Sequence, residues 1–213
     1  MGPRQFLLAT RNAHKVREIT ALLAGLPIEL SSLGDLGIES LPGEDDVEVY
    51  SSFEQNAIAK ARFYRHHTGM AVIADDSGLC VDALGGGPGV RSRRFASDHG
   101  LGRTDQDAAN NDCLVRLLDG VEAHDRGAHY RCAVASAAAD RTLVVSGRVD
   151  GLIVREERGA GGFGYDPLFL VPEHGLTFGE LPAEVKASIS HRAEAVRSFR
   201  RWLEALAPEE ESR

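Results

Sequence analysis

Residues 71–78 read Ala-Val-Ile-Ala-Asp-Asp-Ser-Gly, and this stretch decides the fold class. The apolar residues 71–74 predict a buried strand that ends in two adjacent carboxylates. Open α/β sheets bind their ligands at strand ends of this kind, although four such residues alone fit a polar turn equally well. Because successive strand residues point to opposite faces, we expect one of Asp75 and Asp76 in the reaction site and the other supporting it.

A glycine-rich segment follows, Gly85 to Gly89, and it leads directly into Arg91, Arg93 and Arg94. Glycines of this density predict a loop whose backbone comes close to another group. The segment is not a P-loop, since no Gly-Lys-Ser or Gly-Lys-Thr follows. Carboxylates that hold a divalent cation, together with arginines that hold anionic oxygens, favour a site for a polyphosphate ester.

Composition limits the classes of function. The chain has 213 residues, a net charge of -8 and a pI near 5.5. The length predicts one domain, and the acidic balance argues against binding to a nucleic-acid polymer or a membrane surface. Three scattered cysteines, Cys80, Cys113 and Cys132, predict core residues rather than disulfides. With no signal peptide and no membrane-spanning run, we expect a cytoplasmic protein.

The basic residues are unusual, because 21 of the 24 are arginine. The lysines that remain are Lys15, Lys60 and Lys186. In so arginine-rich a chain, a lysine indicates a place that needs a compact ammonium group.

The first half of the chain predicts alternating strands and helices. We expect a strand over residues 5–10, a helix carrying Val16 and Ile19, and a strand over residues 27–32. In the turn before the first helix, Thr10 or Asn12 either caps the helix or, with Lys15, helps to bind phosphate. An acidic segment over residues 41–50 precedes a helix that runs from a Ser51/Glu54 capping box to about residue 67.

The second half predicts a helix capped by Thr104 and Asp107, then neighbouring strands over residues 128–134 and 143–149. Glycines around Phe163 either present an aromatic face to a planar base or form a buried hairpin corner. A short strand over residues 168–170 and a last helix follow. We expect His191 and Arg192 at the start of that helix, off its buried face.

Five segments together resemble the inosine triphosphate pyrophosphatase family, which acts on non-standard purine nucleoside triphosphates. They are Thr10-x-Asn12-x-x-Lys15, residues 74–79, Gly86-x-Pro88-Gly89, residues 162–167, and Lys186-x-x-x-Ser190-His191-Arg192. The resemblance runs from Phe6 to about Leu206. It implies hydrolysis of dITP, ITP, XTP and dXTP to monophosphate and pyrophosphate, with Mg²⁺, in a homodimer.

The resemblance also assigns residues. The turn of Thr10, Arg11, Asn12, Ala13, His14 and Lys15 is similar to the triphosphate-binding turn of the family, and Lys60 matches a basic position that faces phosphate. Glu48 and Asp76 match the metal ligands, Asp76 matches the proton acceptor, and Ser77 beside it matches a substrate contact. The base and phosphate contacts of the family correspond to Phe163, Gly164, Tyr165, Asp166, Lys186, His191 and Arg192.

Base choice follows from donors and acceptors. Hypoxanthine and xanthine present an oxygen at C6, which donors such as His191 and Arg192 would satisfy, whereas adenine presents an amino group there. A buried donor that faces another donor costs roughly 1 to 3 kcal/mol.

The chain departs from the family pattern in two places. Val49-Tyr50 stands where Thr-Gly is common after the glutamate, which leaves Glu44, Asp45 or Asp46 as alternatives to Glu48. Arg91 and Arg93 add positive charge after the glycine loop.

The resemblance implies an α/β fold with an elongated, twisted mixed sheet flanked by helices. It predicts one domain, residues 1–207, of two lobes with the active site in the cleft between them, and an acidic disordered tail at 208–213. Three other functions stay open. A Maf-type pyrophosphatase would accept a different base, a nucleotide-binding regulator would not hydrolyse, and a phosphomonoesterase would use an aspartyl nucleophile. The unbroken Asp75-Asp76 pair argues against the last, since that chemistry needs alternating carboxylates.

Overall fold

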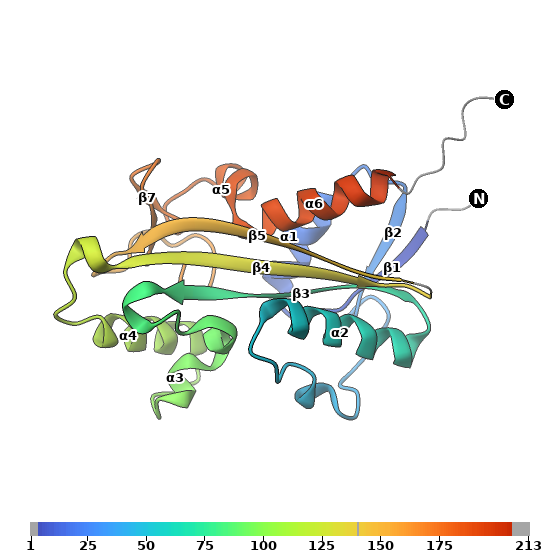
Figure 1. Ribbon diagram of the computed structural model, residues 1–213, viewed down its shortest axis with the longest axis horizontal. Coiled ribbons are helices and arrows are strands. Elements are labelled where there is room, and N and C mark those ends of the chain that lie inside the picture. The colour runs from blue at the N-terminus through green and yellow to red at the C-terminus, as the bar shows by residue number, and fades with distance from the viewer. Residues whose placement is uncertain (1–3, 140, 206–213) are drawn as a thin grey trace. The chain divides into compact units, whose positions relative to one another are not determined.

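The computed structural model describes residues 4–139 and 141–205. Within these residues, seven strands form one sheet in the order β2-β1-β3-β4-β5-β6-β7 (Figure 1). The strands are β1 (Arg4–Leu8), β2 (Ile28–Ser32), β3 (Ala71–Val81), β4 (Gly127–Ala137), β5 (Thr142–Ile153), β6 (Phe169–Val171) and β7 (Leu176–Thr177). The helices are α1 (Ala13–Leu23), α2 (Phe53–Thr68), α3 (Phe95–Asp98), α4 (Gln106–Leu117), α5 (Ala183–Ile189) and α6 (His191–Ala205). The sheet is mixed, because β1 runs parallel to β2 and β3 whereas β6 runs antiparallel to β5 and β7. The predicted α/β class is confirmed.

The chain divides into two compact units. The first unit holds the chain up to Asp76, together with Cys132–Gly147 and the segment from Arg192 onward. The second unit holds Ser77–Arg131 and Arg148–His191. The predicted tail, 208–213, lies outside the described residues.

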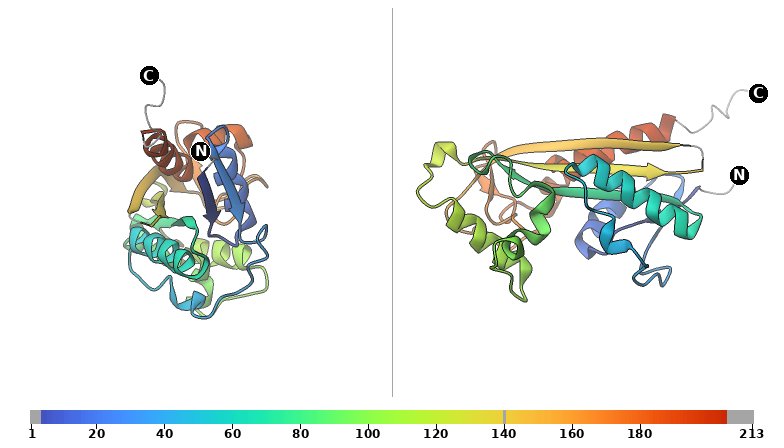
Figure 2. Two further views of the ribbon diagram at one scale, coloured as in Figure 1. Left: turned by 90° about the vertical axis from the view of Figure 1, so that its right-hand side faces the viewer. Right: turned by 60° about the horizontal axis from the view of Figure 1, so that its bottom comes forward.

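In the first unit, helices cover both faces of the parallel strands. Phe6 and Leu8 of β1 and Ile73 of β3 share a core with α1 and α6. Leu7, Val72 and Ala74 alternate with them and are fully buried toward the other face. Helix α2 lies on that face, across the sheet from α6 (Figures 1 and 2). Ala9 N, just past the carboxyl end of β1, donates to Ile73 O at 2.8 Å, so β1 ends beside the middle of β3. The carboxyl end of a parallel strand is the place where an open α/β sheet binds ligands.

The second unit has its own core. Leu79 and Val81 of β3 pack there with residues of α3 and α4, with Ala128 and Tyr130 of β4, and with the aromatic side chains of Phe169 and Phe178. This core holds the glycine-rich segment around Phe163 in place, because Tyr165 and Leu168 belong to it.

Strand β3 is longer than the sequence predicted. It continues through Asp75 and Asp76 to Val81, and both carboxylates are buried in mid-strand. The predicted strand ended there because its apolar run stops at the two aspartates, and burying charged side chains in a sheet interior is costly. In the structure, ion pairs with Asp75 and a hydrogen bond to Asp76 offset the cost of burying the two carboxylates.

Three other boundaries also differ. The cap of α2 is Ser52, whose hydroxyl accepts from Gln55 N at 3.2 Å, and not Ser51. The cap of α4 is Asp105, not Thr104. Lys186 precedes the last helix, as predicted, but it lies within α5, a short helix that was not predicted.

The cysteines are as predicted. Cys80, Cys113 and Cys132 are free and buried. No helix in the described part of the chain is long and apolar enough to cross a membrane.

Candidate active site

The turn after β1 is built by Asn12. Its side chain caps α1, because Asn12 Oδ1 accepts from His14 N at 2.9 Å and from Lys15 N at 3.2 Å. Thr10 is buried, and its hydroxyl accepts from Asn12 N at 3.3 Å. The cap fixes the first turn of α1, from which Lys15 reaches Asp75 in the middle of β3.

The side chain of Arg11 binds other groups of the protein. The guanidinium forms a two-pronged ion pair with Glu44, at 2.7 and 2.8 Å, and also donates to the carbonyls of Ile38 and Glu39. Tyr64 donates to the same carboxylate. Such planar bidentate pairs are among the strongest charge-assisted contacts. Arg11 therefore joins the turn after β1 to the acidic segment that leads to Glu48.

Asp75 forms a buried ion pair with Lys15. Lys15 Nζ lies 2.8 Å from Asp75 Oδ2, and Arg192 Nε lies 3.6 Å from the same oxygen. Asp75 is fully buried. Burial opposes its ionisation, but Lys15 and Arg192 outweigh this, so the pKa of Asp75 lies below its ordinary value. The ionised form of Asp75 is therefore favoured, and it pairs with Lys15.

Asp76, the next residue, has the opposite electrostatic character. It is 9% exposed, and burial raises its pKa above the ordinary value. Its Oδ2 accepts from Asn56 Nδ2 of α2 at 2.9 Å. Adjacent carboxylates whose pKa values are pushed apart are typical of a division into acid-base and supporting roles. The division of roles between Asp75 and Asp76 stays a prediction, which the opposite directions of their pKa shifts favour.

Glu48 pairs with Lys60. Lys60 Nζ contacts Glu48 Oε1, and the ammonium lowers the pKa of Glu48 against the effect of its burial. The alternatives to Glu48 are less suitable, since Glu44 is held by Arg11 and Asp45 and Asp46 are exposed. We call Lys15, Glu48, Lys60, Asp75 and Asp76 the carboxylate–lysine cluster.

The carboxylate–lysine cluster fits a magnesium ion in its donor chemistry. No group of three or more His, Cys, Asp or Glu residues suited to a metal exists in the described part of the chain. Mg²⁺ usually takes one or two carboxylates and completes its shell with water and phosphate oxygens. Glu48 and Asp76 supply such a pair, and Asp76 Oδ1 accepts no hydrogen bond from the described residues.

In the second unit, Asp166 organises another set of predicted residues. Lys186 Nζ lies 2.6 Å from Asp166 Oδ2, which also accepts from Phe163 N at 2.7 Å. The ammonium lies 5.0 Å from the centre of the Phe163 ring. A Cβ at Gly162, where φ is +75°, would stand 2.0 Å from Asp166 Oδ2, so only glycine fits there.

His191 and Arg192 are buried, which corrects the prediction that they lie off the buried face. His191 is 4% exposed and stacks on Tyr130, with ring centres 4.7 Å apart. Arg192 is 2% exposed and pairs with Glu18 and Asp75. These partners offset the cost of burying the guanidinium.

The remaining predicted site residues differ in how far they are exposed to solvent. Tyr165 is buried, and its hydroxyl donates to Ser92 O at 2.8 Å, so its side chain belongs to the core. Gly164 is held by its N–H, which donates to Asp107 of α4 at 2.8 Å. His14 and Ala13 are exposed, and Ser77 is half-buried next to Asp76.

The glycine loop approaches its own chain. Gly87 O accepts from Val81 N at 2.8 Å, and Gly86 N donates to Val81 O at 3.0 Å. Arg91 pairs with Asp98 at 2.6 Å. The loop thus folds back on the end of β3, and the close contact that its glycines predicted is made with backbone.

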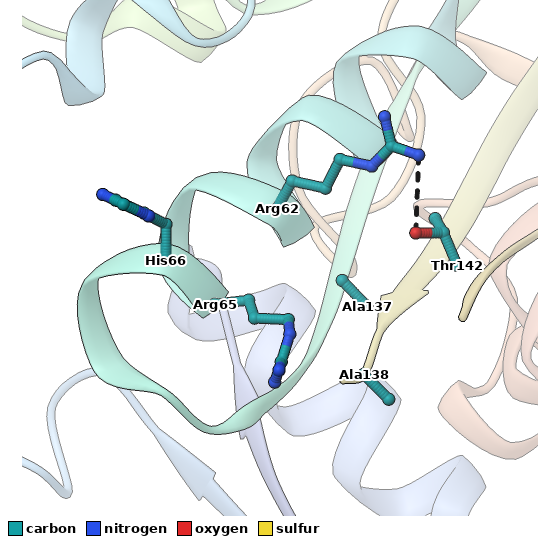
Figure 3. A pocket seen from close by; sticks show the side chains of 6 residues that line it. All are labelled: Arg62, Arg65, His66, Ala137, Ala138 and Thr142. Carbon is teal, nitrogen blue, oxygen red and sulfur yellow. Dashed lines mark hydrogen bonds between the residues drawn. The ribbon is translucent and has the colours of Figure 1, made fainter. Parts of the chain in front are cut away.

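A separate pocket in the first unit is lined by Arg62, Arg65, His66, Ala137, Ala138 and Thr142 (Figure 3). Its cations do not converge on one point. Arg62 reaches Thr142, His66 points away from the two alanines, and Arg65 donates to the carbonyls of Gly69 and Met70. None of the predicted site residues lines this pocket.

Sequence reasoning missed three residues of the site: Asn56, Glu44 as the partner of Arg11, and Glu18 as the partner of Arg192. Asn56 had a readable signal. It lies four residues before Lys60, so the two share one face of α2. Glu18 had none, because it lies 174 positions from Arg192 in the chain.

Comparison with known proteins agrees with these assignments of fold. The dITP/XTP pyrophosphatase of Geobacillus kaustophilus is 46% identical over 206 residues, which cover 95% of this chain and 96% of that protein. The dITP/XTP pyrophosphatase of Methylococcus capsulatus is 45% identical over 206 residues, with 95% and 98% covered. The structure of a HAM1 protein from Coxiella burnetii matches with a TM-score of 0.82 at 34% identity, covering 95% of this chain and 99% of that one. A model of the Ham1 family matches residues 6–202, and the chain therefore belongs to the Ham1 family.

Proposed function

We propose that this protein is a pyrophosphatase that hydrolyses dITP, ITP, XTP and dXTP to the monophosphate and pyrophosphate. Relatives named dITP/XTP pyrophosphatase match it over nearly their whole length, at up to 46% identity. The observation that carries the proposal is the carboxylate–lysine cluster, which lies where the carboxyl end of β1 meets the middle of β3. The cluster combines two ammonium groups that could bind phosphate, Lys15 and Lys60, with a carboxylate whose pKa is raised, Asp76.

The reaction adds water across the triphosphate chain. The oxygen of water bonds to a phosphorus atom, the link between the α- and β-phosphates breaks, and pyrophosphate leaves. Asp76 accepts the proton of the water, a role that suits a carboxylate whose pKa is raised by burial. Lys15 and Lys60 neutralise charge on the leaving pyrophosphate, and no covalent intermediate is needed.

Magnesium is the proposed cofactor. Glu48 and Asp76 would hold the ion, which when bound withdraws negative charge from phosphate oxygens and lowers the pKa of bound water. Asp75 would stay outside the metal shell, because Lys15 and Arg192 already neutralise it.

The base contacts are assigned to the residues around Asp166. Phe163 offers an aromatic face, Lys186 and Asp166 offer a donor and an acceptor, and His191 is oriented by its stack on Tyr130. A donor aimed at the C6 oxygen of hypoxanthine or xanthine would disfavour adenine, about tenfold to a hundredfold. Arg192, which pairs with Glu18 and Asp75, would share this role only if a base replaced one of those contacts.

Two further properties come with the proposal: the protein works in the cytoplasm, and it forms a homodimer. The dimer is tested by sedimentation equilibrium, where a mass twice that of the 22.9 kDa chain is expected. A measured mass equal to that of one chain at micromolar concentration would contradict the proposed dimer.

The substrate assignment is tested by assaying pyrophosphate release with Mg²⁺ from dITP, XTP, ATP, GTP and dTTP. Release chiefly from dITP and XTP supports it. Release chiefly from dTTP would point to a Maf-type preference, and tight binding of dITP without any product would point to a nucleotide-binding regulator.

A further inference from the structure

Asn56 is a buried polar residue that no role in the proposed reaction yet uses. It lies in the first turn of α2 and is 1% exposed. Buried amides are almost always fully hydrogen-bonded, so the partners of Asn56 show what holds it in place.

The amide of Asn56 makes three hydrogen bonds. Its Oδ1 accepts from Tyr50 N at 2.9 Å, and its Nδ2 donates to Tyr50 O at 3.3 Å and to Asp76 Oδ2 at 2.9 Å. The contacts also fix which way the amide points. With the amide reversed, Oδ1 would face a carboxylate and Nδ2 would face an N–H group.

These contacts join the two proposed metal ligands. Tyr50 lies two residues after Glu48, so holding its backbone fixes the segment that carries Glu48. One helical turn further along α2, Lys60 contacts the Glu48 carboxylate itself. Asn56 and Lys60 stand on the same face of α2, four residues apart, so this one face contacts both Asp76 and Glu48.

We propose that Asn56 is a positioning residue: its amide orients the Asp76 carboxylate and ties the Glu48–Tyr50 segment to it. The inference rests on the proposed function, within which it explains how two carboxylates from separate segments come to serve one ion. Asp76 Oδ2 accepts from Asn56, whereas Oδ1 accepts no hydrogen bond from the described residues and would be available to the ion or the water.

The test replaces Asn56 by leucine, which has a similar shape but no hydrogen-bonding groups. The matched control is Asn110→Leu. Asn110 is 3% exposed, and its amide bonds the backbone groups of Ser92, Arg93 and Ala96 but no carboxylate. Both variants lose buried hydrogen bonds, and only Asn56→Leu loses a contact with a proposed ligand.

Two readouts separate positioning from stability. The first is the affinity of the nucleotide-free protein for Mn²⁺, measured from the electron paramagnetic resonance signal of free Mn²⁺. Loss of a residue that orients a metal ligand typically costs 10- to 100-fold in affinity, so Asn56→Leu should bind Mn²⁺ about 10- to 100-fold more weakly. The second is steady-state hydrolysis of dITP, where kcat should fall about 10²-fold with little change in KM. Asn110→Leu should keep both values.

Several outcomes would overturn the inference. One is unchanged Mn²⁺ affinity and kcat in Asn56→Leu, and another is an equal loss in both variants that follows their Tm. If Asn56→Leu does not fold, the smaller Asn56→Ser serves in its place, with the same expectation. Should the wild-type protein fail to hydrolyse dITP, the proposed function falls, whereas the Mn²⁺ comparison still decides the role of Asn56.

Discussion

The adjacent residues Asp75 and Asp76 show how neighbouring groups of one type acquire different properties. Asp75 is held ionised by Lys15 and Arg192, whereas Asp76 has only the neutral amide of Asn56 as a hydrogen-bond donor in the described part of the chain. Strand alternation separates the two environments. The pKa of one is lowered and that of the other is raised.

Replacing Asp75 by asparagine should destabilise the protein strongly. The change leaves Lys15 and Arg192 without their shared carboxylate, and breaking a buried ion pair from one side costs about 3 to 5 kcal/mol. Urea unfolding measures the loss. The control, Asp46→Asn, changes an exposed carboxylate and should stay within about 0.5 kcal/mol of wild type. A loss in Asp75→Asn no larger than in the control would contradict the proposed pairing.

At this scale the sequence predicted which residues belong to the site but not which residues they pair with. All three lysines were singled out, and each does contact a carboxylate: Asp75, Glu48 and Asp166. The burial of Arg192 could not be read, because it depends on Glu18 and Asp75, which only the folded chain brings to it.

Among the elements, helix α2 contributes most to the site. It carries Asn56 and Lys60 on one face, and its first turn is fixed by the hydroxyl of Ser52. The sequence predicted the helix and its buried face, of which Phe53, Ala57, Ala61 and Tyr64 are all buried. It placed the cap one residue early, since Ser51 and Ser52 are chemically equivalent and only backbone geometry distinguishes them.

The cap can be tested directly. Ser52→Ala should cost about 1 kcal/mol of unfolding free energy, because it removes the acceptor for Gln55 N. Ser51→Ala is the matched control, and its unfolding free energy should stay close to that of wild type. Thermal or urea unfolding of the pair decides between them, and the reverse order of effects would restore the Ser51 assignment.

Strand β3 was predicted only in part. Apolar residues predicted its first half, but not its passage through the two aspartates to Val81. Gly78 allows the second half of β3 to pack closely against the glycine loop. A Cβ there would stand 2.3 Å from Ser92 Oγ and 2.4 Å from Gly89 O, so the glycine loop could not pack against the strand.

For the molecule as a whole, several buried charges make stability depend on pH. The pKa of Glu44 is lowered to about 2, chiefly by its hydrogen bonds with Arg11, and the pKa of Asp75 is also lowered. A carboxylate with a lowered pKa stabilises the fold above its unfolded pKa, and this stability is lost as the pH falls through the folded value. Asp76, whose pKa is raised, acts in the opposite direction.

The free energy of unfolding should therefore fall as the pH drops from about 4.5 toward 2. Glu44→Gln removes one of the responsible groups, so its stability should change less steeply over the same interval. Urea unfolding at a series of pH values measures both curves. Parallel curves for the two proteins would show that Glu44 does not contribute to the acid dependence.

The α/β class and the family could be predicted for the whole chain because five motifs occur in order along it. The division into two compact units, with β3, β4 and β5 contributing residues to both, could not be placed at particular residues from the sequence. Those strands are continuous, and nothing in their composition changes at Asp76 or Cys132.

The central claim is that Asp76 accepts the proton in a reaction that releases pyrophosphate. The most direct measurement is ³¹P NMR of dITP with Mg²⁺, for the wild type and for Asp76→Asn. We expect the wild type to give one pyrophosphate for each dIMP, and the variant, still folded by circular dichroism, to be slower by about 10² to 10⁴-fold. Diphosphate with inorganic phosphate as products, or an undiminished rate in Asp76→Asn, would contradict the account.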